Sequence, residues 1–210
     1  MQELVSLAGI VSALAIGVVS PGPSFVMVAR IAISTSRAQG LAASIGMGLG
    51  GVVFALAALL GLQAILLAVP AVYVGLKVLG GLYLCYLGYR IFSGAKEPLR
   101  IEEAGGSGST PWYGSLWLGF TTQVSNPKTA IVYASVFAAF LPNAFSVPFA
   151  LALLCAVFVV EAGWYAIVSL VLSSAVPRRA YLSYKSWVDR TAGLVMVGLG
   201  LKLIASAHRP

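Results

Sequence analysis

The sequence predicts an all-α fold, that of a polytopic membrane protein with six transmembrane helices arranged as two inverted three-helix repeats. Of the 210 residues, 60% are hydrophobic and only 9% are charged, whereas soluble domains carry about 25% charged residues. Prolines interrupt two apolar regions at comparable places in the two halves, so that the first helix of each repeat is expected to be broken. Three long stretches contain no charged side chain: residues 4–29, 38–76 and 129–160.

Six segments are long enough to cross a bilayer, because a transmembrane helix needs about 20 consecutive apolar residues. They form one transmembrane domain, residues 1–210, in which repeat one covers 1–92 and repeat two covers 113–210. The segment 93–112 between them contains charged residues and a Gly-Ser run, which is typical of a flexible linker. The expected spans are residues 4–28, 41–68, 71–92, 114–139, 148–172 and 190–206, with a second polar loop at 173–189.

The first two spans have features that fix their interpretation. The chain begins Gln2-Glu3 without a basic segment, and its first apolar stretch is longer than that of a signal peptide, so we expect a retained span. In the second span Ala42, Gly46 and Gly50 recur every four residues, which lets helix backbones approach closely. We expect this stripe to pack within the molecule. The later spans are separated by Pro70 and by a turn from Pro142 to Pro148.

Basic residues are concentrated in the loops after spans one, three and five. Because Lys and Arg collect in cytoplasmic loops, these loops are expected inside and both termini on the non-cytoplasmic side. The same bias accounts for the net charge of +7, so no nucleic-acid partner is expected. The basic residues of the cytoplasmic loops are Arg30, Arg37, Arg90, Lys96, Arg100, Arg178, Arg179, Lys185 and Arg190, against Lys77, Lys202 and Arg209 on the other side.

The two halves share a glycine pattern. Gly81 and Gly88 in span three recur 112 residues later as Gly193 and Gly200 in span six, and the serines that open the two proline motifs are 105 residues apart. Since each repeat has an odd number of spans, the second must cross the membrane in the opposite sense. Inverted repeats of this kind are a frequent architecture of transporters.

The two proline motifs predict the binding site. A proline inside a helix removes an N–H donor and clashes with the carbonyl four residues back, which frees the backbone oxygens of Gly17, Val19 and Gln123. Such groups must find a partner or line a cavity within a membrane, and broken helices at matching places point to a transporter's substrate site. We therefore predict substrate binding at Pro21, Gly22, Pro23, Ser24, Asn126, Pro127, Lys128 and Thr129.

Lys128 directly follows the break at Pro127. A helix N-terminus carries about half a positive charge, and an ammonium beside it makes a site suited to a substrate carboxylate. The alternative is a lysine that extends from the end of span four toward the membrane surface. That second role is the one expected for Lys77 and Lys202, which are close to the ends of their own spans.

Glu161 is the only acidic residue inside a predicted span. An apolar setting favours the neutral form of a carboxyl group, so we expect Glu161 to take and release protons, or to receive a substrate ammonium. The alternative is a structural ion pair with Lys128. Tyr165 follows one helical turn later and reaches the same face, which places it among the expected substrate-binding residues.

Two other functions can be weighed against the cysteines and the remaining ligand-type residues. Cys85 and Cys155 match no metal-binding spacing and are expected to be buried structural thiols, although a membrane thiol-redox relay would use such a pair. A divalent-metal exporter would need several oxygen, His or Cys ligands, and beside Glu161 the chain offers one histidine, His208. Neither an enzyme, a bound metal nor a cofactor is expected, because no catalytic constellation or phosphate-binding loop is present.

The motifs occur along nearly the whole chain in a recognisable order. Pro21-Gly22-Pro23 comes first, a small-residue span two and a Gly-Leu-Tyr-rich span three follow, Asn126-Pro127-Lys128 opens the later part of span four, and Glu161 with Tyr165 lies in span five. In this order they resemble the LysE/RhtB family of bacterial amino-acid exporters. The motif residues of spans two and three are Gly46 to Gly50, Gly61-Leu62 and Leu79 to Gly88.

The resemblance implies six spans in a bacterial cytoplasmic (inner) membrane and a secondary transporter that exports amino acids or close derivatives, driven by protons. The substrate carboxylate would meet Lys128, and its ammonium would meet carbonyls near Gly17 and Gly22, or Glu161. The chain has Ser24 where the family often has Asn, and Gly51 where many members have a polar or acidic residue. Both departures bear on the substrate. The sequence fixes neither the amino acid, the coupling ion nor whether a homo-oligomer forms.

Overall fold

The computed structural model describes residues 1–20, 22–68, 70–96 and 111–207, without the side chains of 34, 62–73, 76, 175–182 and 206. Within these ranges the chain forms eight α-helices and one short 3-10 helix, and no strand. Three stretches of helix in the described residues are long and apolar enough to cross a membrane: Gln2–Val19, Arg37–Gly61 and Val147–Leu172. The predicted all-helical fold is confirmed.

In the first half of the chain, the apolar stretch predicted as span one forms two helices. They are α1 (Gln2–Val19) and α2 (Pro23–Ser34), followed by α3 (Arg37–Ala68) and α4 (Pro70–Ser93). Pro23 is the first residue of α2, a position where the missing N–H costs no hydrogen bond. The break between α1 and α2 therefore coincides with the first proline motif.

In the second half, the stretch predicted as span four is likewise divided, into α5 (Trp112–Val124) and α6 (Pro127–Phe140). After α6 come α7 (Val147–Leu172) and α8 (Ala175–Ser206), while a 3-10 turn, Gly94–Lys96, follows α4. Residues 97–110 of the predicted linker lie outside the described residues.

One boundary prediction was wrong. The polar loop expected at 173–189 is mostly helix, because α8 begins at Ala175. Charged residues do not interrupt a helix when they pair along its surface, and Lys185 forms an ion pair of 2.7 Å with Asp189, four residues on. Oppositely charged residues at this spacing stabilise a helix. The polar composition of residues 173–189 was thus wrongly interpreted as a loop.

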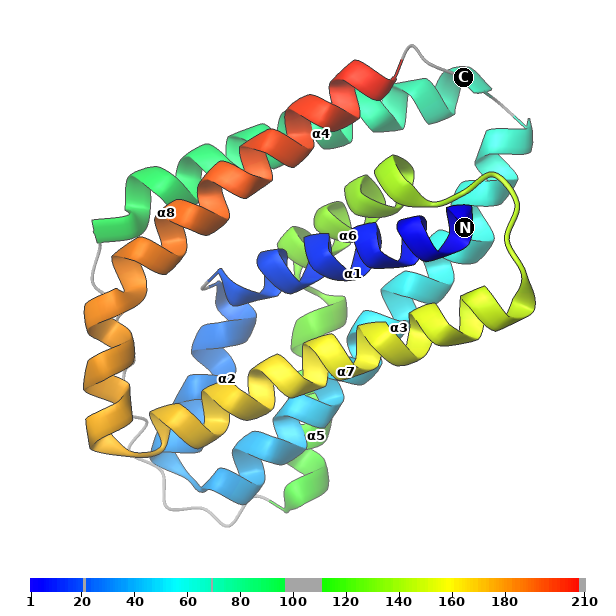
Figure 1. Cartoon of the computed structure of the whole chain (residues 1–210). Coiled ribbons are helices and arrows are strands. Elements are labelled where there is room, and N and C mark those ends of the chain that lie inside the picture. Colours follow the sequence, from blue (N-terminus) through cyan, green and yellow to red (C-terminus); the bar gives the residue numbers. More distant parts are fainter. Residues whose placement is uncertain (21, 69, 97–110, 208–210) are drawn as a thin grey trace.

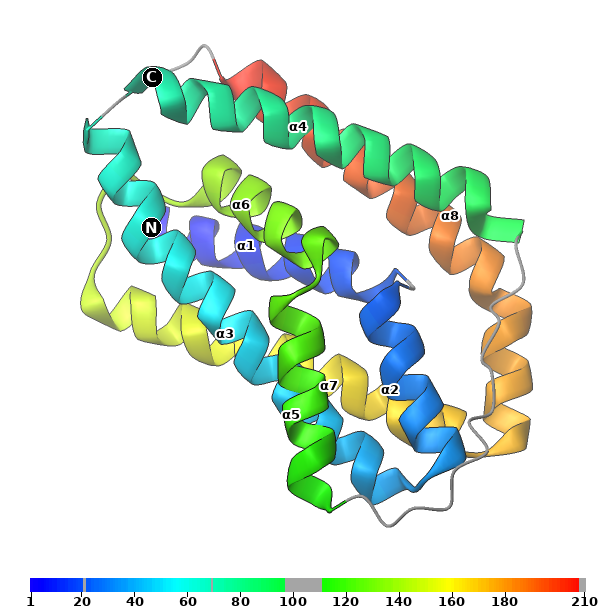
Figure 2. The ribbon, with the colours of Figure 1, turned by 180° about the vertical axis from the view of Figure 1, so that it is seen from behind.

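The helices surround a centre that the two broken helices share. Helices α4 and α8 run antiparallel along one flank, and α1 and α6 lie between them and the group formed by α3, α5 and α7 (Figure 1). The view from behind shows the same order, with both breaks turned toward the middle (Figure 2). The residues around the breaks are consequently surrounded by other helices.

The apolar core consists of two clusters. Helix α7 contributes Leu153 and Val157 to the first cluster and Tyr165 and Val168 to the second. Glu161 is buried between these two groups on the same helix. The first break has a similar place, because α1 mainly joins the first cluster and α2 the second. Polar residues at this level are therefore held between two well-packed apolar regions.

The small-residue stripe of α3 packs within the molecule, as predicted. A Cβ atom on Gly46 would collide with the carbonyl oxygen of Leu116, and one on Gly119 with that of Ala43. One helical turn after Gly46, Gly50 lies against the side chain of Gln123. The close approach of α3 and α5 fixes the position of Gln123 at the end of α5.

Candidate site at the two helix breaks

Residues from both breaks line one small buried cavity, which we call the inner cavity. Its volume is about 30 Å³, room for about two or three water molecules. Pro23 and Pro127 line an adjoining cavity instead, and Pro21 lies outside the described residues. The polar residues and glycines of the inner cavity are Gly17, Ser20, Gly22, Ser24, Gln123, Asn126, Lys128, Thr129, Tyr133, Glu161 and Tyr165.

The second break satisfies its own backbone groups. The side chain of Asn126, the N-cap of α6, accepts a hydrogen bond of 3.0 Å from the N–H of Lys128. The N–H of Asn126 donates to the carbonyl oxygen of Gln123 at 3.1 Å. The expectation of a free carbonyl at Gln123 was therefore wrong: the chain turns tightly enough after α5 for a later N–H to replace the one that Pro127 lacks.

The first break receives a partner from the second. Gly22 caps α2 without a side-chain hydrogen bond, and the carbonyl oxygen of Ser20 accepts a hydrogen bond of 2.9 Å from Nζ of Lys128. The hydroxyl of Ser20 is buried and has no partner among the described atoms. Lys128 therefore points into the protein rather than toward a membrane surface, and it holds the end of α1.

Glu161 is only 3% exposed, and both of its carboxyl oxygens accept hydrogen bonds. Nε2 of Gln123 donates to Oε2 and the hydroxyl of Tyr133 donates to Oε1, each at 2.9 Å. No ion pair joins Glu161 to Lys128 among the described residues, so the alternative of a direct structural pair does not describe this conformation. The carboxyl group is held by neutral donors instead.

A chain of hydrogen bonds leads from Glu161 to both breaks. Gln123 bonds Glu161 through Nε2 and accepts from the hydroxyl of Ser24 at 3.0 Å through Oε1. The hydroxyl of Ser24 in turn accepts from Nδ2 of Asn126 at 2.9 Å. The network joins α2, α5, α6 and α7, so a change at Glu161 can be felt at the start of α2 and of α6.

Sequence reasoning missed two members of this network. The side chain of Gln123 bridges Glu161 and Ser24, and the hydroxyl of Tyr133 binds Glu161. Gln123 was detectable as a buried amide within an apolar segment, since such polar groups need partners. Tyr133 was detectable by spacing, because it follows Thr129 by four residues and hence lies on the same face of α6.

Gly51 explains why α3 can pass close to Glu161. A Cβ atom at this position would lie 2.8 Å from the hydroxyl of Tyr133 and 2.9 Å from Cγ of Glu161. Both distances are too short for a carbon atom that cannot move away. The side chains of Glu161 and Tyr133 thus occupy the space that a larger residue at position 51 would need, which explains the glycine at this departure from the family pattern.

The two cysteines lie apart from the inner cavity. Sγ of Cys85 lies 3.6 Å from the carbonyl oxygen of Val197, whereas Cys155 is exposed. The prediction that both are buried was wrong, since Cys155 is exposed and Cys85 is only partly buried. An apolar neighbourhood in the sequence also fits a helix face turned toward lipid. Cys85 is on α4 and Cys155 on α7, and these two helices make no contact within the described residues.

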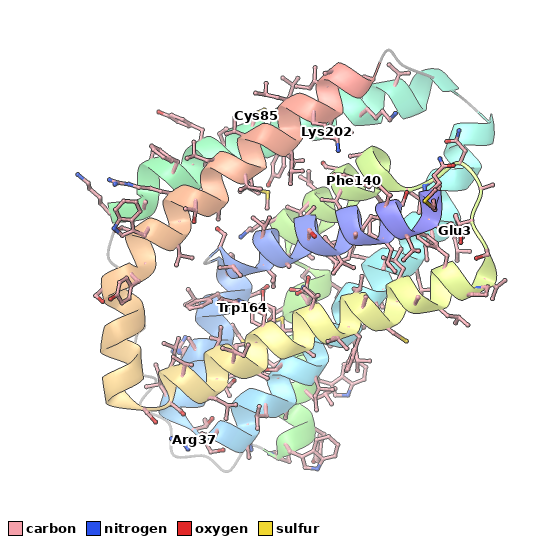
Figure 3. The ribbon with its side chains drawn as sticks, in the orientation of Figure 1. Glu3, Arg37, Cys85, Phe140, Trp164 and Lys202 are labelled. Atoms are coloured by element: carbon pink, nitrogen blue, oxygen red, sulfur yellow. The ribbon has the colours of Figure 1, made fainter. Side chains whose placement is uncertain are left out.

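Polar contacts also occur far from the inner cavity, toward the ends of the helices (Figure 3). The carboxylate of Glu3 accepts from the N–H and the hydroxyl of Ser146 at 2.6 and 3.0 Å. Arg37 donates to the hydroxyls of Ser173 and Ser174 at 2.8 and 2.6 Å. The Nζ of Lys202 lies 4.1 Å from the centre of the Phe140 ring. These contacts connect helix ends and leave the inner cavity to the residues at the breaks.

Long apolar helices, two of them broken around a buried polar cavity, define a helical membrane protein of the kind that moves solutes. The chain belongs to the LysE type translocator family, whose sequence profile matches residues 15–207. It is 30% identical over 192 residues to the threonine efflux protein of Escherichia coli (strain K12), covering 91% of this chain and 93% of the relative.

Other relatives are similar to the same extent. The threonine efflux protein of Salmonella typhi is 31% identical over 195 residues, covering 91% of this chain and 93% of the relative. An uncharacterised membrane protein of Haemophilus influenzae is 30% identical over 192 residues, covering 90% of both chains. No solved structure matches the chain.

Proposed function

We propose that this protein exports small zwitterionic amino acids across the bacterial cytoplasmic membrane and couples the export to the proton gradient. The observation that carries the proposal is the inner cavity, where both broken helices meet around Lys128 and Glu161. Membership of the LysE type translocator family supports it. Because two relatives are named threonine efflux protein, L-threonine is the first substrate to test.

The substrate carboxylate binds Lys128. The ammonium of this lysine contacts a neutral carbonyl, that of Ser20, so no carboxylate of the protein has to be displaced. The N-terminus of α6 adds positive potential beside it. When Lys128 turns to the substrate, the carbonyl of Ser20 is released and can accept from the substrate ammonium. The hydroxyl of Ser20, which is buried without a partner, is a second acceptor at the same place.

Glu161 couples transport to protons. Two donors face its two oxygens, which suits the ionised carboxylate, because a protonated carboxyl must itself donate one hydrogen bond. Protonation therefore forces Gln123 or Tyr133 to change partner. Since Gln123 also accepts from Ser24, the change passes to the hydrogen bonds at both breaks. Proton uptake at Glu161 thus loosens the cavity and its hold on the substrate ammonium.

The two halves act as inverted repeats with six spans, in which α1–α2 and α5–α6 each make one broken span. The packing of α4 against α8 supports this. A Cβ atom on Gly81 would meet the carbonyl oxygen of Gly200 at 2.7 Å, and one on Gly88 that of Gly193 at 2.5 Å. Gly81 corresponds to Gly193 and Gly88 to Gly200 in the repeat, so each contact is the exchanged copy of the other. A twofold axis between antiparallel helices produces this exchange.

Topology can be tested with single cysteines in a variant that lacks Cys85 and Cys155. Cysteines placed at Gly94 and Asn143 should be labelled by a membrane-impermeant reagent from opposite sides of the membrane, with Gly94 accessible only from the cytoplasm. Labelling of both positions from the same side contradicts the six-span arrangement.

Glu161→Gln tests the coupling. In proteoliposomes loaded with labelled L-threonine, a pH gradient should drive efflux through the wild type and not through the variant. Exchange of labelled for unlabelled substrate without a gradient should persist, because Lys128 is intact. The matched control is Glu3→Gln, which alters the carboxylate bonded to Ser146 and should leave both activities unchanged. Gradient-driven efflux by Glu161→Gln at the wild-type rate removes Glu161 from the mechanism.

The two rival functions lack comparable support. A thiol relay needs two cysteines that can meet, and the helices that carry them are not in contact within the described residues. A metal exporter needs a cluster of ligands, and the described residues bring no three His, Cys, Asp or Glu side chains together. Neither rival accounts for the lysine and the carboxyl group at the helix breaks.

A further inference from the structure

A second cavity adjoins the inner cavity and differs from it in size and charge. We call it the outer cavity; its volume is about 400 Å³, within the range of about 300–1,000 Å³ typical of small-molecule sites. Gly22, Asn126 and Lys128 line both cavities. The inner cavity is too small for an amino acid in this conformation, so the outer cavity is the place where a substrate can lie first.

The outer cavity contains a buried carboxylate with an unused acceptor. Asp189 of α8 is 4% exposed, and its Oδ2 accepts from Nζ of Lys185 at 2.7 Å. Its Oδ1 is buried and has no hydrogen-bond partner among the described atoms. A buried acceptor of this kind is costly unless something donates to it. An ammonium group makes a short, charge-assisted hydrogen bond to a carboxylate oxygen, which is stronger than a bond from a neutral donor.

Cationic groups line the same cavity. Arg90 is exposed at its edge, where its guanidinium lies 6.0 Å from the centre of the Tyr86 ring. Lys128 lies where the two cavities join, and it lines the outer cavity together with Asp189. A third cation of the cavity, Lys185, is already paired with Asp189. The outer cavity therefore presents one carboxylate oxygen for an ammonium and two further cations, Arg90 and Lys128, for a carboxylate.

We propose that the outer cavity is a first binding site for the zwitterionic substrate, in which Asp189 receives the ammonium while Lys128 and Arg90 receive the carboxylate. Lys128 is the pivot between the two sites. With its carboxylate held there, the substrate exchanges Asp189 in the outer cavity for Glu161 and the Ser20 carbonyl in the inner one. This inference rests on the proposed export function and adds to it a recognition site and a role for Asp189.

The position of the cavity agrees with loading from the cytoplasm. Arg90 and Lys185 belong to the end of the molecule that the distribution of basic residues assigns to the cytoplasmic side. A cytoplasmic amino acid would reach Arg90 first, then Asp189, and finally Lys128 at the first break. The outer site should therefore govern how well the protein captures substrate at low concentration, more than how fast it moves captured substrate.

Asp189→Asn tests the proposal in inside-out membrane vesicles, in which the cytoplasmic face is accessible. Uptake of labelled L-threonine is measured over a concentration series. If the wild type carries another L-amino acid instead, that amino acid is used. The half-saturating concentration should rise at least tenfold, with a much smaller fall in the maximal rate. Competition by 3-hydroxybutyrate, which lacks the amino group, should improve relative to L-threonine, because the group that recognises the ammonium is gone.

Lys185→Met is the matched control, since it removes the ion-pair partner of Asp189 and leaves the carboxylate. Its half-saturating concentration should rise clearly less than that of Asp189→Asn, because Lys185 also lines the outer cavity but the carboxylate that receives the ammonium is kept. Equal changes in Asp189→Asn and Lys185→Met indicate that Asp189 merely pairs with Lys185, which overturns the proposal. If Asp189→Asn does not fold, as judged by size-exclusion chromatography, Arg90→Gln replaces it. Its half-saturating concentration should rise about threefold. An unchanged half-saturating concentration in Arg90→Gln overturns the proposal.

The failure of this inference can be told apart from the failure of the proposed function. A wild type that carries no amino acid in these vesicles overturns both. A wild type that carries L-threonine, with Asp189→Asn unchanged in half-saturation, overturns the outer site alone. Loss of the maximal rate at an unchanged half-saturation also overturns it, because a first binding site must affect capture.

Discussion

The break between α1 and α2 and the break between α5 and α6 both end at a proline that begins the next helix, but they satisfy their backbone groups in different ways. At the second break Asn126 caps α6 with its own side chain and donates its own N–H to Gln123. At the first break no side chain caps α2, and the carbonyl of Ser20 depends on Lys128 from the other half.

This difference shows that the two breaks have different roles in the site. The second break is locally complete and carries the charge, whereas the first supplies backbone acceptors and needs an outside donor. A ligand that competes for Lys128 therefore disturbs the first break before the second. Substitutions at the two breaks should accordingly have unequal effects, and the predictions below follow that order from the largest to the smallest.

Lys128→Met should have the largest effect, because it removes both the proposed carboxylate anchor and the partner of Ser20. Efflux should fall at least 100-fold, and the free energy of unfolding should fall by about 2 kcal/mol, the size of a hydrogen bond to a charged group. Efflux assays and thermal unfolding in detergent measure the two effects. The matched control is Lys202→Met, which loses a contact with the Phe140 ring and should export normally. Export within threefold of wild type by Lys128→Met contradicts the shared role.

Gln123→Leu should come next, since leucine is of similar size but cannot form hydrogen bonds, and the change cuts the link from Glu161 to both breaks. The carboxyl oxygen that it leaves without a donor is buried, so the protein should lose about 1–3 kcal/mol of stability, and efflux should fall about tenfold or more. Gln39→Leu is a suitable control, because Gln39 accepts from Ser115 and does not line the inner cavity. Unequal damage in these two variants locates the effect in the network.

The two breaks, the approximate extent of the helices before α8 and most of the residues of the candidate site could be predicted from the sequence. Proline chemistry is local, so residues 20–23 and 125–128 identified the breaks without knowledge of the fold, and the charge of Lys128 and Glu161 at membrane depth singled these two out. The intramolecular packing of Gly46 was also predictable, because small residues at helical spacing indicate close helix contact.

The remaining features could not be predicted because they depend on which helices meet. The contact of Lys128 with Ser20 joins residues more than 100 positions apart. The two hydrogen bonds that Glu161 accepts, from Gln123 and from Tyr133, require α5, α6 and α7 to converge. The length of α8 was missed for a different reason. Its first turns are polar, and a pattern that seeks apolar spans cannot separate a helix outside the membrane from a loop.

The next largest effect is expected from substitutions at the two N-caps, which compare the breaks directly. Asn126→Ala removes the N-cap of α6 and the bond to Ser24, and should lower stability by about 1–2 kcal/mol. Gly22→Ala should cost little, because the extended backbone at φ −157° suits any residue and a Cβ atom would lie 3.5 Å from Lys128. Thermal unfolding of both variants measures the difference. Equal losses contradict the view that only the second break is capped by its own side chain.

Ser20→Ala should have the smallest effect on the free energy of unfolding. Whether it raises or lowers this free energy tells whether the hydroxyl has a structural partner. The hydroxyl is buried without a partner among the described atoms, so its removal should be neutral or stabilising by up to about 1 kcal/mol, a rise of about 2–4 °C in the midpoint of unfolding. The backbone carbonyl that holds Lys128 remains. If the hydroxyl receives the substrate ammonium, efflux should nevertheless fall severalfold, because proteins often keep destabilising groups where function needs them. A Ser20→Ala variant that is both less stable and fully active requires a structural partner for this hydroxyl, and the hydroxyl then loses its proposed role as the second acceptor for the substrate ammonium.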